Sequence, residues 1–135
     1  MMKSLLRSDD RGGVRQYDSS IRIASQSFPG VEFTIHRISF GRRMELCRRV
    51  RDIGQKLEFL EAGNHFHEKV EANLLSHEID KIYLEWGLVR VDGLLIDGEP
   101  ATGELVVVKG PEDLTKEILE AIKGQCGLSE EERKN

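Results

Sequence analysis

Apolar and polar residues alternate with a period of two in two short stretches of the first third of the chain. Residues 21–23 form the first stretch, and residues 31–35 form the second, after the turn signal Pro29-Gly30. Side chains alternate between the two faces of a strand, so the apolar residues of each stretch share one face. We therefore predict two β-strands joined through Pro29-Gly30.

From Ser39 onward the apolar spacing changes to three and four residues, the period of an amphipathic helix. Ser39 is the expected N-cap, because its hydroxyl can accept a hydrogen bond from the first turn. Gly63 is the expected stop. The predicted stripe consists of Phe40, Met44, Cys47, Val50, Ile53, Leu57 and Leu60.

A second helical stripe follows Asn64, the expected N-cap of the next helix, and ends at Gly87. Its members are Phe66, Val70, Leu74, Leu75, Ile79, Ile82, Tyr83 and Trp86. The link Gly63-Asn64 is so short that the two helices must pack antiparallel. The sequence therefore predicts a long helical hairpin.

A small β region is expected after this hairpin. Residues 88–91 and 94–96 are apolar except for Arg90, and each stretch is followed by Asp-Gly, at Asp92-Gly93 and Asp97-Gly98. Asp-Gly is the strongest short turn signal, because both residues tolerate a positive φ. The pattern predicts a small β-hairpin with a tight exit loop.

Residues 105–108 fit two structures. Their β-branched side chains favour a strand, whereas Thr102 as a cap with Glu104 in the first turn favours a short helix, which we prefer. A clearer helix starts at Gly110-Pro111, because proline at a first helical position loses no needed donor. Its stripe is Leu114, Ile118, Ile122 and Cys126, and Gly127 ends it.

The two ends of the chain are polar. Residues 1–20 cannot bury enough apolar area to fold by themselves, so we expect a flexible N-terminal arm. Ser129 and Glu132 fit a capping box that opens a frayed, charged C-terminal tail. The sequence thus predicts one mainly helical α+β domain over residues 21–135, with a short N-terminal β element, a long helical hairpin, a small β-hairpin and a C-terminal helix.

Composition narrows the class of protein. The chain has 135 residues, a net charge of -4 and 33% charged residues, which fits one domain with a heavily charged surface. No apolar run approaches the ~20 residues of a membrane span, and the first ten residues do not resemble a secretory signal. Two cysteines are too few for a disulfide framework, so we expect a cytosolic protein. The acidic balance argues against nucleic-acid binding.

One cluster has the residue types of a metal site. His67 and Glu71 stand four residues apart on one helical face, a spacing that zinc ligands use. A zinc-dependent hydrolase using these two residues is therefore one alternative. His77 lies nearly three turns further on, beyond reach of the same ion, and His65 precedes the helix. Solvated surface residues are the simpler interpretation.

Charge is distributed unequally between the two predicted helices. Residues 37–56 contain seven basic residues against two acids, a net of +5, and residues 57–85 contain seven acids against two basic residues, a net of -5. Antiparallel packing would place these charges side by side, which is the interpretation we favour. The alternative is a basic docking face for an acidic protein partner.

The remaining candidate groups favour structural roles. Cys47 lies in a helical stripe and is expected in the core, and Trp86 is expected as a core anchor. Cys126 is at the C-terminal end of its helix, where the dipole does not activate a thiol. No glycine-rich phosphate loop is present. The residues themselves therefore indicate a domain without catalysis.

Three stretches together resemble tail assembly chaperones of tailed bacteriophages and prophages. They are residues 38–46 with 57–63, residues 83–88 running into 94–101, and residues 110–114 with 126–135. The resemblance implies a non-enzymatic protein of the host bacterial cytoplasm, without cofactor or metal and absent from the mature virion. It also implies binding to the tape-measure protein and recruitment of tail tube subunits. Such proteins are often made in two lengths through a programmed frameshift.

The first helix is the expected docking element for the client. Its apolar strip, widened by Leu46 and Phe59, could exchange between packing within the protein and packing on a client helix. The partner-binding residues that we predict are Phe40, Arg42, Arg43, Leu46, Arg49 and Phe59. Self-association is also expected, and binding to nucleic acid or membrane is not. The alternatives are a structural tail component, such as a terminator or connector subunit, and a DNA-binding regulator.

Overall fold

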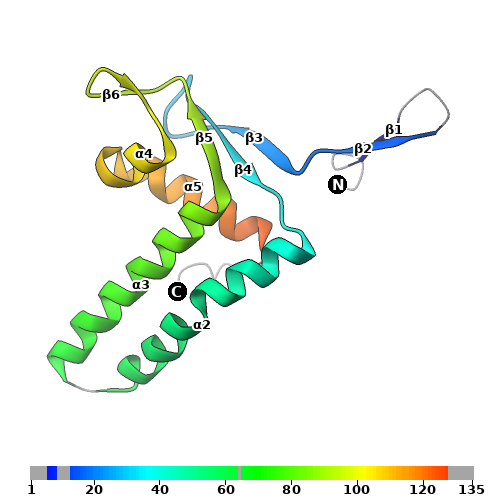
Figure 1. Ribbon diagram of the computed structural model, residues 1–135. Helices are drawn as coiled ribbons and strands as arrows, with labels where there is room; N and C mark the ends of the chain where they lie inside the picture. The colour runs from blue at the N-terminus through cyan, green and yellow to red at the C-terminus, as the bar shows by residue number, and fades with distance from the viewer. Residues whose placement is uncertain (1–5, 9–12, 64, 128–135) are drawn as a thin grey trace.

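The computed structural model describes residues 6–8, 13–63 and 65–127. In chain order its elements are β1 (Leu6–Ser8), β2 (Arg15–Tyr17), β3 (Ser20–Ala24), β4 (Glu32–His36), α2 (Phe40–Glu61), α3 (Phe66–Gly87), β5 (Leu88–Asp92), β6 (Leu95–Ile96), β7 (Glu99–Pro100), α4 (Gly103–Lys109) and α5 (Glu112–Gln125). This is the predicted mainly helical α+β fold, with its helical hairpin and its β-hairpin (Figure 1).

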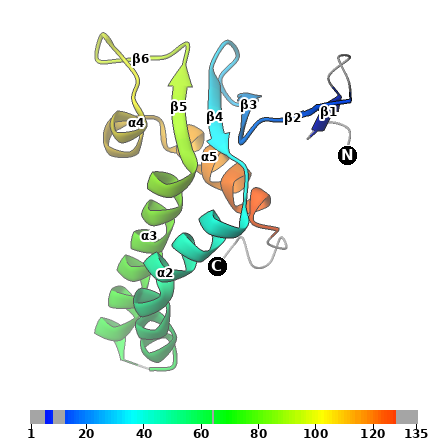
Figure 2. The same ribbon diagram turned by 45° about the vertical axis from the view of Figure 1, so that its right-hand side comes forward.

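The centre of the fold is an antiparallel sheet with strand order β3-β4-β5. Helix α5 lies against one face of this sheet, as both views show (Figures 1 and 2). Phe33 and Ile35 of β4 are fully buried, as are Leu114, Ile118 and Ile122 of α5. The apolar residues spaced by two in β4 and those spaced by four in α5 therefore pack in one core. Each spacing had predicted a buried face for its element.

The region after the hairpin corrects one detail of the prediction. Strand β5 does not turn back at Asp92-Gly93 but joins the sheet beside β4, with Val91 opposite Phe33. The small hairpin is formed by β6 and β7 instead, around Asp97 (φ 52°) and Gly98 (φ 82°). Two consecutive positive φ angles are what this tight turn requires.

Helices α2 and α3 form the predicted hairpin, which projects from the sheet (Figure 1). The Ser39 hydroxyl accepts the Arg42 N–H at 3.2 Å and caps α2 as expected. Helix α3 is capped at His65, whose N–H donates to Glu68 at 3.4 Å. The expected cap, Asn64, lies outside the described residues.

The start of α2 contacts the end of α3, and the end of α3 packs against α5. The Trp86 indole N–H donates to the Arg42 carbonyl at 3.1 Å, and the Arg42 guanidinium lies 4.7 Å from the Trp86 ring centroid and donates to the Trp86 carbonyl. Next to them, a Cβ added at Gly87 would lie 2.6 Å from Cγ2 of Ile122. Glycine therefore lets the end of α3 run directly against α5.

The remaining helices follow their sequence signals, whereas the two strands of the N-terminal arm were not predicted. Residues 105–108 belong to the short helix α4, where the Thr102 hydroxyl accepts the Leu105 N–H at 3.1 Å. Gly127 ends α5 with a φ of 76°. The described part of the N-terminal arm contains the paired strands β1 and β2, which extend away from the sheet (Figure 1). The C-terminal tail, with Ser129 and Glu132, lies outside the described residues.

Candidate protein-interaction surface

The apolar stripe predicted for α2 is divided between two faces of the helix. Phe40 and Met44 are 82% and 41% exposed, and Cys47 is exposed as well, which contradicts its expected place in the core. Val50 and Ile53 are partly covered. Each step of three residues turns the stripe back by about 60°, so the three steps from Met44 to Ile53 carry it roughly half way around the helix.

Helix α3 is divided in the same way. Phe66, Val70 and Leu74 are 82%, 43% and 59% exposed, whereas Ala72 and Leu75 are buried at 8% each. The prediction that all apolar residues of α3 share one covered face is therefore wrong for its first two turns. Residues 66, 70 and 74 form a line of their own, because steps of four turn by only about 40°.

Each helix thus carries an exposed apolar line. Arginines lie beside the line on α2, and charges of both signs, including the exposed Lys69 and Lys81, lie beside the line on α3. We call Phe40, Met44 and Cys47 with the exposed Arg43, Arg48 and Arg51 the α2 outer face. It holds a hollow of about 290 Å³ lined by Arg43, Met44, Cys47, Arg48 and Arg51. We call Phe66, Val70 and Leu74 with the exposed Glu71 and Glu78 the α3 outer face. These lines are unusual, because large apolar side chains gather on a surface chiefly at binding sites.

Two of the six predicted partner-binding residues have roles inside the fold. Leu46 is only 5% exposed and packs in the core, so the monomer does not offer it to a partner. Arg42 is held on Trp86 at the hairpin base, as described above. Both face inward because they lie on the side of α2 that meets α3 and the body.

The other four predicted residues lie at the surface. Phe40 and Phe59 are 82% and 74% exposed. Arg43 is exposed although its guanidinium donates to the Cys126 carbonyl at 3.3 Å, and Arg49 pairs with Glu45 of its own helix at 2.8 Å. The aromatic residues are therefore the strongest members of the predicted set.

The opposite charges of α2 and α3 do not pair with each other. The ion pairs of α2 are internal: Arg49 with Glu45, and Arg51 with Asp52 at 3.4 Å. Across the described residues 40–63 and 65–87, no ion pair joins one helix to the other. The two helices do pack side by side, so the interpretation that the basic run lies beside the acids of its partner helix stays a prediction, without direct ion pairs between the described side chains.

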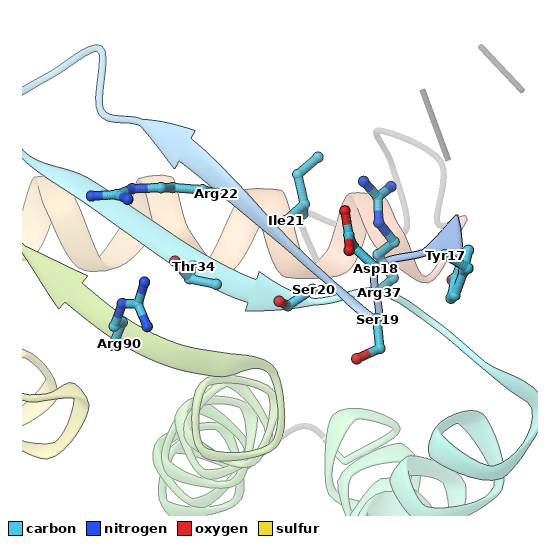
Figure 3. Close-up of a pocket in the computed structure, with 9 residues that line it drawn as sticks. All are labelled: Tyr17, Asp18, Ser19, Ser20, Ile21, Arg22, Thr34, Arg37 and Arg90. Atoms are coloured by element: carbon cyan, nitrogen blue, oxygen red, sulfur yellow. The ribbon is translucent and has the colours of Figure 1, made fainter. Parts of the chain in front are cut away.

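A second candidate site is a polar hollow of about 610 Å³ beside the sheet (Figure 3). Arg22, Thr34 and Arg90 form one row across β3, β4 and β5 at its floor. The Thr34 hydroxyl is buried without a hydrogen-bond partner among the described atoms.

Both arginines of this row are already paired with carboxylates. Arg22 lies 2.7 Å from Glu32, and Arg90 lies 3.1 Å from Asp92. An anion entering the hollow would have to compete with these carboxylates. The row therefore stabilises the sheet and offers little net positive charge to a ligand.

The candidate metal ligands do not come together among the residues that the structure describes. Where the chain is described, no group of three or more His, Cys, Asp or Glu side chains could hold a metal ion. The rings of His65 and His67 stack 5.7 Å apart. Burial raises the pKa of the Cys126 thiol even with Arg43 nearby, which keeps it in its less reactive form. None of the described helices is long and apolar enough to cross a membrane.

Comparisons with protein-family models, with curated proteins and with solved structures find no match for this chain.

Proposed function

We propose that this protein is a non-catalytic assembly chaperone of the tailed-phage type, acting in the host cytoplasm. Its helical hairpin binds the tape-measure protein while the tail is built and helps to recruit tail tube subunits. The observation that carries the proposal is the exposed apolar surface of α2 and α3, combined with the resemblance of the sequence. A helical hairpin with exposed apolar residues along both helices is better suited to binding a long helical client than a small molecule.

The energetics favour binding that can be reversed. Full burial of one large apolar side chain is worth about 1.5–3 kcal/mol. Phe66, Val70 and Leu74 could therefore supply several kcal/mol to a contact, much of which offsets the cost of association. An assembly chaperone needs such moderate affinity, because it must leave the client when the tail tube forms.

Co-expression with a tape-measure protein from the genome that encodes this chain tests the proposal. We expect the soluble fraction of the long protein to rise and the two proteins to co-purify. The double variant Phe66→Ser/Leu74→Ser should remove this effect, since it makes the α3 outer face polar. Val108→Ser is the matched control, because Val108 is 69% exposed on α4, beside the last turns of α3 and outside the α3 outer face.

Two results would contradict the proposal. One is an unchanged solubility of the tape-measure protein when this chain is present. The other is the presence of this chain in purified mature particles at the copy number of a structural subunit. That second result would favour the alternative of a terminator or connector.

A further inference from the structure

We propose that residues 128–132, which follow α5, dock onto the hollow of the α2 outer face within the same chain. In this arrangement Leu128 covers the apolar floor of the hollow, and the three consecutive acids at 130–132 lie beside its arginines. The contact is formed within one chain, so it can be tested on the purified protein without a client. Its failure would leave the proposed function untouched.

The end of α5 lies beside this hollow, next to the first turns of α2 (Figures 1 and 2). The Cys126 carbonyl accepts a hydrogen bond from the Arg43 guanidinium at 3.3 Å, and Arg43 lines the hollow together with Cys47. Burial raises the pKa of the Cys126 thiol, and smaller effects come from Arg43, which lowers it, and from Cys47, which raises it. Both side chains of α2 are therefore close to the point where the docked segment begins.

The segment is long enough to cover the hollow. Gly127 has a φ of 76°, a left-handed conformation that ends α5 and lets the chain leave the helix axis. An extended chain spans at most ~3.3–3.6 Å per residue, so residues 130–132 can lie up to about 13–22 Å from Cys126. Residues 43–51 of α2 span about 12 Å, at ~1.5 Å per residue. The three acids can therefore reach every arginine that lines the hollow.

The charges of the segment and of the hollow are complementary. Three exposed arginines line the hollow: Arg43, Arg48 and Arg51. Among the described side chains Arg51 pairs with Asp52 at 3.4 Å, whereas neither of the other two forms an ion pair. The acids at 130–132 are the longest acidic run of the chain, and the basic pair Arg133-Lys134 follows them directly. Attraction to the arginines thus ends at residue 132, which is where we end the docked segment.

The apolar groups correspond as well. Met44 and Cys47 lie between the arginines of the hollow, which has a volume of about 290 Å³, and Met44 is 41% exposed. Leu128 is the one large apolar residue of the sequence after Cys126, and it precedes the acids. Docking would remove the apolar surfaces of Leu128 and of the floor from water together.

The docked segment has a consequence for the α2 outer face. A partner of this face must displace the segment, because both use the same hollow. Such a partner binds only the fraction of molecules in which the hollow is open, so its apparent affinity falls in proportion to that fraction. The segment thus acts as an internal competitor on α2 and leaves the α3 outer face free.

The reactivity of Cys47 measures this cover directly. N-ethylmaleimide reacts mainly at Cys47, because Cys126 is only 6% exposed. Leu128→Ser and the triple variant Glu130→Gln/Glu131→Gln/Glu132→Gln should each raise the labelling rate by about threefold or more, since the hollow is then open for a larger fraction of the time. In the unmodified chain the rate should rise with salt, which screens the ion pairs.

The matched control removes three exposed acids of the hairpin and so makes the same change in net charge: Glu58→Gln/Glu61→Gln/Glu71→Gln. Glu58 lies about 16 Å from Cys47 along α2, at ~1.5 Å per residue. Equal acceleration in the control and in the triple tail variant would show that the rate follows net charge, and would overturn the proposal. An unchanged rate in either tail variant would also overturn it.

Cross-linking gives an independent test of position. In Ser129→Cys, a short bismaleimide should join the new thiol to Cys47 within one chain, which mass spectrometry detects as a cross-linked monomer. Adding Glu130→Gln/Glu131→Gln/Glu132→Gln should lower the yield several-fold, although the length of chain between the two thiols is unchanged. Equal yields with and without the acids would show that tethering alone brings the thiols together, and would overturn the proposal.

Discussion

The body of the molecule and its helical hairpin use apolar residues in opposite ways. All six of the largest fully buried side chains belong to β4, α4 or α5: Phe33, Ile35, Val106, Leu114, Ile118 and Ile122. The hairpin exposes residues of the same kind, including Phe40, Phe59, Phe66 and Leu74. The body therefore buries its largest apolar side chains completely, although it exposes Val89, Leu95 and Val108, whereas the hairpin exposes large apolar side chains along both of its helices.

The largest effect is expected from a truncation in the core of the body. Ile122 is fully buried against Gly87, so Ile122→Ala should lower the free energy of unfolding by about 3–4 kcal/mol. Leu74→Ala in the hairpin removes a similar volume and is the matched control, with an expected change within about 0.5 kcal/mol. Urea unfolding followed by circular dichroism measures both. If both variants lose the same free energy of unfolding, the apolar residues of the hairpin contribute to stability as much as those of the body's core.

The next effect is expected at the ion pair that links the hairpin to the body. Lys123 of α5 is only 4% exposed and lies 2.9 Å from Asp80 of α3. Asp80→Asn removes one carboxylate from the buried ammonium group, which also lies 5.4 Å from the Tyr83 ring centroid; breaking a fully buried pair costs about 3–5 kcal/mol. The Asp80 side chain is 32% exposed, so we expect about 2–3 kcal/mol in thermal unfolding.

The double variant Asp80→Asn/Lys123→Met is the control for this pair. It removes both charges and should recover part of the lost stability, because an apolar side chain suits the buried position. If the double variant is less stable than Asp80→Asn, the cost does not come from the buried charge of Lys123.

A smaller effect is expected where a carboxylate holds the β3–β4 loop on α5. Glu117 accepts the Ser25 hydroxyl and the Gln26 N–H, both at 2.7 Å. Burial alone would raise the pKa of Glu117, but these hydrogen bonds outweigh it and hold the pKa below its ordinary value of 4.5. The contact therefore stabilises the fold above the ordinary pKa and loses its contribution as the pH falls through the lowered one.

Glu117→Gln tests this contact in the body. We expect a loss of about 1 kcal/mol near neutral pH, and a smaller difference from the unmodified chain in acid, where Glu117 itself is protonated. Urea unfolding at about pH 7 and about pH 3 makes the comparison. A difference that grows in acid would contradict the assigned direction of the pKa.

The smallest effect on stability, and the most informative one for function, is expected on the α3 outer face. Leu74→Ser should change the free energy of unfolding by less than about 0.5 kcal/mol, since the residue is 59% exposed. It should nevertheless weaken self-association and retention of the tape-measure protein. Ultracentrifugation and co-purification measure these two losses separately. If self-association and co-purification of the tape-measure protein are both unchanged, the α3 outer face binds neither a second copy nor the tape-measure protein.

Local signals were sufficient for most elements of the fold. Ser39 and Thr102 cap their helices as expected, Asp97-Gly98 forms its turn, and Leu114, Ile118 and Ile122 are buried together. Each of these depends on residues within a few positions of one another. The pairing of β5 with β4 was missed, because β4 and β5 are separated by the whole hairpin and no local signal specifies such a partner.

The surface of the hairpin was only partly predictable. Phe40 and Phe59 were expected at a binding surface and are exposed, whereas Leu46 is buried and Cys47 is exposed, against expectation. An apolar spacing of three or four identifies a helix but tolerates a stripe that turns around its axis. The apolar residues of the α3 outer face were missed for the same reason, since they were assigned to the face that packs.

The sequence by itself determined within a few residues where the helices and the Asp97-Gly98 turn lie, because caps, turn residues and apolar periods act over a few residues. It also determined that α2 and α3 carry opposite charge. Only the tertiary structure decided which apolar residues are covered, because coverage depends on the partners that the fold supplies. The sheet and α5 supply partners on every side of the body's core, whereas each hairpin helix has a neighbour on one side and keeps its other apolar line exposed.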